Sequence, residues 1–487
     1  MRCFIGLDYR AMRENRANAV VYDPTELING HMVLSGMSGT GKSFTSLRFL
    51  NSAARSGYAI DVFDVHEELH GIDGAVTAKY SQATGYGFNP LVLDTDKHEG
   101  GPLRQIELLV GLIKSVSPLG INQEMALRNL MAEVYRLRGI QKDKPNTWAR
   151  EIITEREWQQ LKDARRYGDL RAYYPTLGDL LDFAWRKIQA LKIGGDKTST
   201  AAFEALVRAR KQLDKQHKAW RKAVNVGDRE QLEIKIEDLE NKAVEAYSDF
   251  IRSMETGSEL DDITNFDNAD TLQGVVRRLE LINSAGIFLS NPPPFGDARV
   301  RVHQIKSLTP EQQVLFTKLR LREIFEQCKA LGPTASGTEI RRVIFLDEAH
   351  KFFSDEGTDI LNVIAKEGRK FGVALWVASQ DPRKFPTELV SNCGATVFLG
   401  LHSSFWTQII SKFRIPEATL RQIKPKEVLA IRLQREGEGD PEFMTVAVPN
   451  PNTELGRKVA DWFAAASRKS KPAAAGRPQA REVQAHG

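Results

Sequence analysis

The segment Gly36–Ser43 constrains the fold of this 487-residue chain more than any other feature. It reads Gly-Met-Ser-Gly-Thr-Gly-Lys-Ser, which matches the pattern G-x-x-x-x-G-K-[ST] in full. The apolar run Val33–Ser35 precedes it and the helical run Phe44–Ala54 follows it, and this is the strand–loop–helix setting that a phosphate-binding loop requires. We therefore expect a phosphate cradle at the end of a strand in an α/β domain.

The chemistry of this cradle follows from its residue types. Glycines let the backbone turn tightly, so that successive N–H groups point to phosphate oxygens, and the helix N-terminus adds partial positive charge. Lys42 is expected to reach the β- and γ-phosphates, and the Ser43 hydroxyl to ligate Mg²⁺. The predicted ligands are thus ATP and Mg²⁺. The residues predicted to bind the nucleotide are Gly36, Met37, Ser38, Gly39, Thr40, Gly41, Lys42, Ser43 and Phe44.

Phosphoryl transfer also needs a carboxylate near Mg²⁺ and a group that orients the attacking water. The apolar run Val343–Leu346 ends in Asp347 and Glu348, which supply both at the end of one predicted strand. Loops often begin with acidic residues, so this pair alone is only moderately specific. Together with the phosphate cradle it predicts ATP hydrolysis, with Asp347 as a metal ligand and Glu348 as the general base.

Two further residues are candidates for the same reaction. Val373–Ser379 resembles another buried strand, and Gln380 at its tip could hydrogen-bond the γ-phosphate or simply cap a turn. Arg369 lies just before that strand, in a basic cluster that by its spacing alone is typical of a solvated helix end. An arginine supplied by a neighbouring subunit can, however, raise the rate of phosphoryl transfer by roughly 10³–10⁵.

The order of the predicted elements indicates an α/β core interrupted by a large helical insertion. Strands are expected at Ala59–Val65, Gly87–Leu91 and Thr396–Leu401, and helices at Val314–Leu331 and Thr358–Lys370. Strands that alternate with helices favour a mostly parallel sheet covered on both faces. The predicted segments are 1–28 (a short hairpin, Cys3–Leu7 with Asn18–Tyr22), 29–100 and 271–450 (the two parts of the ATPase core), 101–270 (helical insertion), 451–466 (a last helix) and 467–487 (a basic flexible tail).

The insertion contains a predicted helical hairpin. Leu206, Leu213 and Trp220 recur every seven residues, and after Gly227-Asp228 apolar residues recur at steps of three and four from Leu232 onward. The remaining positions are dense in Lys, Arg and Glu. The hairpin could be a structural arm, or a surface that contacts DNA or a partner.

Composition excludes some classes of protein but does not indicate a function. The net charge of +5 is concentrated in the end of the chain, because Ser467–Gly487 holds five basic residues and one acid. No apolar run approaches the roughly 18 residues that a membrane helix needs, and the first residues lack the pattern of a signal peptide. Three distant cysteines without CxxC spacing suit a reducing compartment, so we predict a cytoplasmic protein. His66, His350 and His402 show no metal-ligand spacing and are expected to be structural or surface residues.

Several segments together resemble the HerA/FtsK superfamily of hexameric P-loop ATPases, most closely its HerA branch. The residues that carry the resemblance are His31–Ser43, Phe345–His350, Ala365–Val373, Ala378–Gln380 and Ser391–Gly394. The resemblance implies a RecA-like core, a homohexameric ring with ATP at subunit interfaces, Arg369 as the finger reaching a neighbour's nucleotide, and Gln380 as a sensor. It also implies movement of duplex DNA through the ring and a NurA-type nuclease as a possible partner.

The sequence departs from this family in two ways that leave the branch open. HerA proteins usually carry a β-barrel before the phosphate-binding loop, and here the segment before it offers one hairpin. The helical insertion is similar to that of type IV secretion and conjugation ATPases, which energise membrane-associated transfer machines. A third alternative is a nucleotide-gated scaffold, but Asp347, Glu348 and Arg369 together argue against it because a scaffold needs no catalytic base.

Overall fold

The chain forms two compact units, each described here by itself. Unit 1 comprises Met1–Lys79, Pro294–Ser307 and the chain from Phe316 onward, and unit 2 comprises Tyr80–Pro293 and Leu308–Leu315. The predicted insertion, 101–270, falls within the limits of unit 2. The computed structural model describes residues 1–193, 197–223, 225–252, 269–336, 339–354, 359–439 and 441–469, so most of the predicted basic tail lies outside the described residues.

Unit 1 is built on one sheet of the order β2-β1-β11-β10-β9-β3-β8-β7-β4-β6-β5. From β9 to β5 every neighbouring pair is parallel, whereas the pairs from β2 to β9 are antiparallel. The predicted α/β fold with a mostly parallel sheet is confirmed. The strands are β1 Cys3–Asp8, β2 Ala19–Tyr22, β3 Met32–Ser35, β4 Ala59–Asp64, β5 Ala75–Lys79, β6 Val300–Gln304, β7 Arg342–Leu346, β8 Val373–Ser379, β9 Ala395–Phe398, β10 Val428–Leu433 and β11 Met444–Ala447.

The central strands are apolar on both faces, as expected for parallel strands covered by helices. All seven residues of β8 are buried, and so are the four residues of β3. Trp376 of β8 packs edge-on against Tyr22 and Phe49, with ring centroids 6.0 and 6.1 Å away. The helices that belong wholly to unit 1 are α1 Tyr9–Arg13, α2 Lys42–Arg55, α12 Ile360–Glu367, α13 Thr387–Ser391, α14 Trp406–Phe413, α15 Glu417–Gln422 and α16 Glu454–Lys469.

Three neighbouring strands of the sheet share a buried ion cluster. Asp61 of β4 accepts a hydrogen bond from Arg342 of β7 at 2.5 Å and lies 3.2 Å from Nε2 of His303 on β6. Burial alone would raise the pKa of Asp61, but the contacts with His303 and Arg342 outweigh it and lower the pKa to about 2. These contacts of Asp61 therefore stabilise the side-by-side arrangement of β6, β4 and β7.

Strand order brings distant motifs to the same edge of the sheet. β3 lies between β8 and β9, and β7 lies on the other side of β8. Because these strands are parallel, their carboxyl ends meet at one edge. The phosphate-binding loop after β3, the Asp347-Glu348 pair after β7 and Gln380 after β8 are therefore neighbours.

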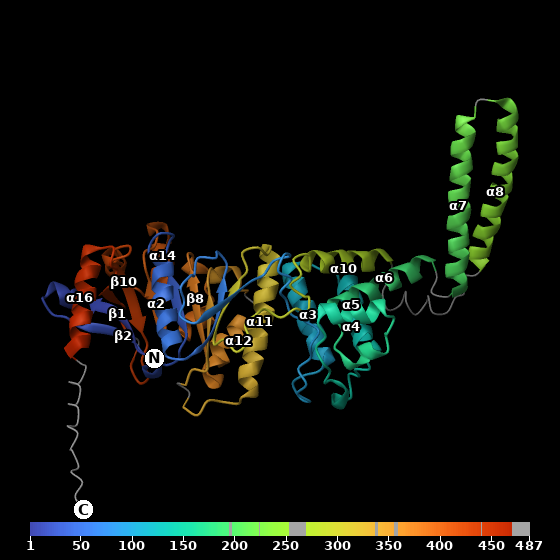
Figure 1. Cartoon of the computed structure of the whole chain (residues 1–487). Helices are drawn as coiled ribbons and strands as arrows, with labels where there is room; N and C mark the ends of the chain where they lie inside the picture. The colour runs from blue at the N-terminus through green and yellow to red at the C-terminus, as the bar shows by residue number, and fades with distance from the viewer. Residues whose placement is uncertain are drawn as a thin grey trace, which may run out of the picture. The chain divides into compact units, whose positions relative to one another are not determined.

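Unit 2 is helical, with no strand among its described residues. Helix α10 packs against α6 and α4, and α3 packs against α4. The predicted hairpin is confirmed as α7 and α8, which lie side by side along their lengths (Figure 1). The helices are α3 Pro102–Val116, α4 Ile121–Leu137, α5 Glu155–Asp163, α6 Leu177–Ile193, α7 Lys197–Lys222, α8 Val226–Arg252 and α10 Ala269–Ile282, while α11 Pro310–Ala330 spans both units.

The strand predicted at Gly87–Leu91 is wrong. This segment joins no ladder of the sheet, because its N–H groups bond elsewhere: Gly87 donates to the carbonyl of Asn291 at 2.9 Å, and Phe88 to that of Ile287 at 3.1 Å. A side chain at Gly87 would approach the carbonyl oxygen of Ile287 to 2.5 Å, so glycine permits this close backbone packing.

Strands β5, β6, β10 and β11 of the observed sheet were not predicted. They are short runs of four to six residues, and β6 (Val-Arg-Val-His-Gln) mixes polar and apolar residues. The predicted strand Thr396–Leu401 is shorter than expected, since β9 ends at Phe398 and Gly400 has a φ of 141°.

Candidate functional site

The phosphate-binding loop turns from β3 into α2 at the edge of the sheet. Gly41, the residue before α2, has a φ of 103°, which a residue with a side chain adopts only with strain. The loop is tied to neighbouring strand ends, because Gly36 N–H donates to the carbonyl of Ser379 at 3.2 Å and Met37 N–H to that of Gly400 at 3.0 Å. The first N–H groups of α2 have no acceptor within the helix, so they are available to an anion at its N-terminus.

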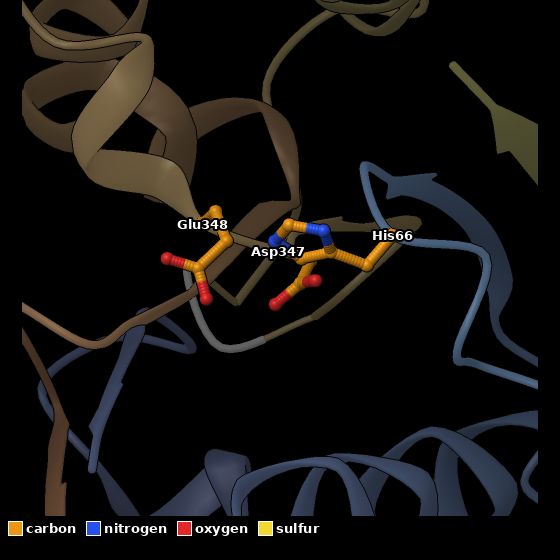
Figure 2. Close-up of side chains that lie close together, drawn as sticks. All are labelled: His66, Asp347 and Glu348. Atoms are coloured by element: carbon orange, nitrogen blue, oxygen red, sulfur yellow. The ribbon is translucent and has the colours of Figure 1, made fainter. Parts of the chain in front are cut away.

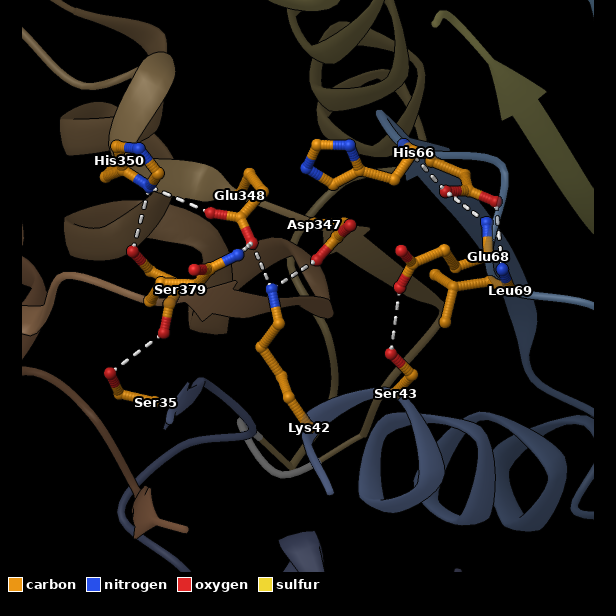
Figure 3. Close-up of polar contacts among 12 residues, drawn as sticks. Ser35, Lys42, Ser43, His66, Glu68, Leu69, Asp347, Glu348, His350 and Ser379 are labelled. Atoms are coloured by element: carbon orange, nitrogen blue, oxygen red, sulfur yellow. Dashed lines mark hydrogen bonds and ion pairs between the residues drawn. The ribbon is translucent and has the colours of Figure 1, made fainter. Parts of the chain in front are cut away.

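Lys42 contacts both predicted acids. Its Nζ lies 3.1 Å from Oδ1 of Asp347 and also donates to Oε1 of Glu348 (Figure 3). The side chains are largely shielded from water, with exposed fractions of 11% for Lys42, 10% for Asp347 and 2% for Glu348. Residues 305 positions apart in the sequence therefore form one buried ion cluster.

The charges in this cluster shift one another's protonation. Burial alone would lower the pKa of Lys42, but the neighbouring Asp347 and Glu348 carboxylates outweigh it and raise that pKa. Burial raises the pKa of Asp347 despite the ammonium beside it. Burial would also raise the pKa of Glu348, yet hydrogen bonds from His350 and Lys42 hold it well below its ordinary range. Glu348 is thus an ionised carboxylate, as a general base must be.

Glu348 is held at both oxygens. Gln380 Nε2 donates to Oε1 at 3.0 Å, and Nδ1 of His350 lies 3.2 Å from Oε2. The same His350 nitrogen lies 3.0 Å from Oγ of Ser379, the last residue of β8. Glu348 itself has a φ of 47°, an uncommon backbone conformation for a residue with a side chain and one that clusters at functional sites. The predicted base and the predicted sensor are therefore in direct contact.

The turn after β4 adds a third group of side chains. The carboxylate of Asp64 accepts N–H bonds from His66 at 3.2 Å, Glu68 at 3.3 Å and Leu69 at 3.1 Å, which shapes this turn (Figure 3). Glu68 in turn accepts a hydrogen bond from the Ser43 hydroxyl at 3.3 Å. The turn after β4 thus lies against the start of α2.

The donor set around the loop fits Mg²⁺, which prefers oxygen ligands. Ser43 offers a hydroxyl and Asp347 a carboxylate, so these two residues would hold the ion, as the sequence predicts. A ring nitrogen of His66 and carboxylate oxygens of Asp347 and Glu348 also lie within 4.8 Å of one another (Figure 2). Imidazole is a poorer partner for Mg²⁺ than for later transition metals, so His66 is not counted among the Mg²⁺ ligands.

Arg369 does not join this cluster within the chain. It lies in the short 3₁₀ helix Gly368–Phe371, and its ion-pair partner among the described residues is Glu436, at 3.0 Å. Both side chains are well exposed, at 38% and 61%. An exposed pair of this kind is weak.

Sequence reasoning missed several residues of the site. His350 was expected to be structural or on the surface, yet it contacts Glu348, and His66 lies beside Asp347. Glu68 was not singled out, and Ser379 was named only as part of the strand end Ala378–Gln380 that carries the family resemblance. The signal that could have found them is position: each stands at or just after the carboxyl end of a parallel strand (β8, β7 or β4), and ligands of parallel sheets bind at that edge.

A family model described as helicase HerA, central domain, matches residues 11–324, almost two thirds of the chain. The chain belongs to this HerA family. It is a P-loop ATPase, and Asp347 and Glu348, the acids predicted to act in catalysis, lie beyond the matched residues. No curated protein sequence matches the chain significantly.

Solved structures are similar to this HerA-family ATPase at low sequence identity. The structure of VirB4 of Thermoanaerobacter pseudethanolicus is similar with a TM-score of 0.58 and 14% identity, covering 92% of this chain and 96% of VirB4. The bacterial conjugative coupling protein TrwBdeltaN70 gives a TM-score of 0.47 and 11% identity, with 92% and 93% covered. Among the described helices, none combines the length and apolar character of a membrane-spanning segment.

Proposed function

We propose that this chain assembles head to tail into a homohexameric ring, hydrolyses ATP at the subunit interfaces and uses the energy to move duplex DNA. The observation that carries the proposal is the Lys42 ammonium, which bonds Asp347 and Glu348 while Gln380 and His350 hold the same Glu348. Membership of the HerA family supports DNA as the substrate.

The same contacts suggest how ATP binding is coupled to catalysis. The γ-phosphate of ATP competes with Glu348 for Lys42, since one ammonium cannot hold both equally well. When Lys42 turns to the phosphate, Glu348 loses its closest cation and can accept a proton from the attacking water. Gln380 and His350 keep the Glu348 carboxylate in place during this exchange. Mg²⁺, held by Ser43 and Asp347, would supply charge neutralisation on the phosphates.

Arg369 completes the proposed site from the neighbouring subunit. A head-to-tail ring places the same surface of each subunit beside the nucleotide of the next. Arg369 and its partner Glu436 are both exposed, so the guanidinium lies at the surface of the subunit, where a neighbouring subunit would meet it. In this arrangement Arg369 would stabilise the charge that develops on the transferred phosphoryl group.

The decisive test measures ATPase rate with and without duplex DNA at several salt concentrations. A translocase is expected to be stimulated, with a stimulation that fades as salt rises because phosphate contacts release counterions. The Glu348→Gln variant serves as the control for contaminating ATPases. An ATPase rate that responds to no nucleic acid at any salt concentration would overturn the translocase proposal.

A second candidate is an ATPase that energises a membrane-associated transfer machine. The likeness to VirB4 along nearly the whole of both chains supports it. Such an ATPase would be stimulated by a membrane-bound partner rather than by DNA, so the same assay separates the two candidates. For the DNA motor we propose a NurA-type nuclease as partner and the cytoplasm as location, where three buried, free cysteines would stay reduced.

A further inference from the structure

The α7–α8 hairpin carries opposite charges on its two outer edges. The basic edge of α7 consists of Arg208, Lys211, Lys215, Lys218 and Lys222, which recur at steps of three and four residues and are all exposed. The acidic edge of α8 consists of Glu230, Glu237 and Glu245, which recur at steps of seven and eight and are exposed as well. Residues at such steps share one face of a helix, so each edge gathers charges of one sign into a stripe, although the exposed Ile234 and Val244 lie between the glutamates of α8.

Both stripes point away from the contact between the two helices. The half-buried residues Leu206, Leu213 and Trp220 of α7 face α8, and each is followed two positions later by a basic residue of the stripe. Two positions turn the helix by roughly 200°, that is, to the opposite side. Glu230 and Glu237 likewise stand two positions before the half-buried Leu232 and Leu239.

Few of these charged residues form ion pairs within the hairpin. The ion pair described between its two helices joins His217 to Glu240 at 3.7 Å. Lys211, Lys215, Lys218 and Lys222 form no ion pair with any described residue, and the same holds for Glu230, Glu237 and Glu245. Arg208 pairs with Glu204 within α7 at 3.8 Å, and the other residues of the two stripes remain available to a partner.

The two stripes also match in spacing, with a small offset along the helix axis. Trp220 Nε1 donates to Glu233 at 3.1 Å and His217 lies beside Glu240, which defines the residues of α7 and α8 that stand at the same level. By these two pairs Lys222 stands level with about residue 233, Lys215 with about 240 and Arg208 with about 247, so Glu230, Glu237 and Glu245 are offset from the basic residues by about two to three residues, roughly 3–5 Å along the helix axis. In a second hairpin placed beside the first in the same orientation, α7 of one copy would face α8 of the other. Successive charges of each stripe would then be about 10 Å apart along the helix axis.

We propose that the basic edge of one copy of this chain docks against the acidic edge of a second copy. Two basic edges repel each other, as do two acidic edges, so the contact is head to tail and repeats from copy to copy. Nucleic acid would explain the basic edge but not an acidic edge of matching spacing on the same hairpin. The inference rests on the proposed ring for its second copy and adds a contact outside the ATPase core.

Cross-linking in full-length chains tests the contact directly. A chain with Lys215→Cys is co-expressed with a chain carrying Glu237→Cys, and a short bis-maleimide is added in the presence of ATP. The three native cysteines are buried, so the wild-type chain is a silent control. We expect a cross-link between the two chains. A matched control pairs Lys215→Cys with Lys235→Cys, which stands roughly 200° around α8 from position 237 and is expected to react far less.

Charge reversal tests the cause of the contact. With both cysteines in place, Lys218→Glu with Lys222→Glu in the Lys215→Cys chain, or Glu230→Lys with Glu245→Lys in the Glu237→Cys chain, should each lower the cross-linked fraction about tenfold at low salt, an effect that higher salt screens. Mixing the two reversed chains should restore it. Basal ATPase activity should not change.

Two results would overturn the docking contact and leave the proposed ring intact, and a third would overturn both. If ATP-dependent rings form, as measured by light scattering, but position 215 does not cross-link to position 237, the docking is wrong and the ring stands. If duplex DNA shields Lys215 from modification and no cross-link forms, the occupant of the basic edge is DNA. If no oligomer forms at all, the proposed ring fails together with the docking.

Discussion

Removing the Lys42 ammonium leaves two adjacent carboxylates in a site that water barely reaches. Breaking a buried ion pair by deleting one partner costs about 3–5 kcal/mol. Gln380 and His350 still bond Glu348, and Asp347 keeps 10% exposure. We therefore expect Lys42→Ala to lower the free energy of unfolding by about 2–3 kcal/mol, which corresponds to a fall in Tm of about 5–10 °C.

The loss should depend on pH, and its sign follows from the protonation of the acids. In the wild type the pKa of Glu348 is lowered, so its stabilising contribution is present above the ordinary pKa of a glutamate and is lost as pH falls. In the variant, burial without the cation raises the pKa of both carboxyls. They then take up protons as pH falls, and the penalty disappears. The Tm difference from wild type should be largest near pH 8 and shrink towards pH 5.

The assay is thermal unfolding of nucleotide-free protein across this pH range. Lys79→Ala serves as the matched control, because Lys79 pairs with Glu67 at 2.9 Å but is 49% exposed. Exposed pairs contribute roughly 0–1 kcal/mol, so its Tm should hardly change. A Lys42→Ala protein that melts within a degree of wild type at pH 8, or whose deficit grows as pH falls, would refute the reasoning.

Three further outcomes test the site and the sheet. Glu348→Gln should keep ATP binding, measured by fluorescent nucleotide titration, and lose about 10²–10⁴ in kcat; near-normal turnover would remove Glu348 as the base. Arg369→Ala subunits doped into wild-type rings should inactivate their neighbours, so a loss of ATPase merely proportional to the mutant fraction would count against a trans role. Asp61 has its pKa lowered to about 2, so its contribution of about 2–3 kcal/mol is present above its ordinary pKa of 3.8 and lost as pH falls towards 2. Asp61→Asn should therefore lower the urea midpoint at pH 7 and much less near pH 2, and an equal loss at both would contradict the ion-pair account.

Elements with strong local signals could be predicted to within a few residues. β8 matches its predicted range, and α2 begins two residues before the predicted run because its first turn belongs to the phosphate-binding motif. The hairpin was predicted from its seven-residue repeat. Buried continuous apolar runs and periodic helices are specified by neighbouring residues, which is why pattern suffices there.

Strands of mixed polarity could not be found in this way. β6 exists because it pairs with β4 and β5, and His303 within it is stabilised by Asp61, 242 positions away. Gly87–Leu91 looked like a strand, but its N–H groups had nearer acceptors in the loop after α10. Both cases depend on partners that local sequence does not contain.

The sequence by itself determined the chemistry that a short motif can hold: a phosphate cradle at Gly36–Ser43, an acid pair at Asp347-Glu348 and a polar strand end at Gln380. Only the tertiary structure decided that β3, β8 and β7 are adjacent, and thereby that Lys42 meets Asp347 across 305 positions of sequence. It also gave His350 a role that spacing did not suggest, through contacts with Glu348 and Ser379. The physical reason is that a motif needs only consecutive backbone and side-chain groups, whereas a catalytic cluster needs the strand order of a folded sheet.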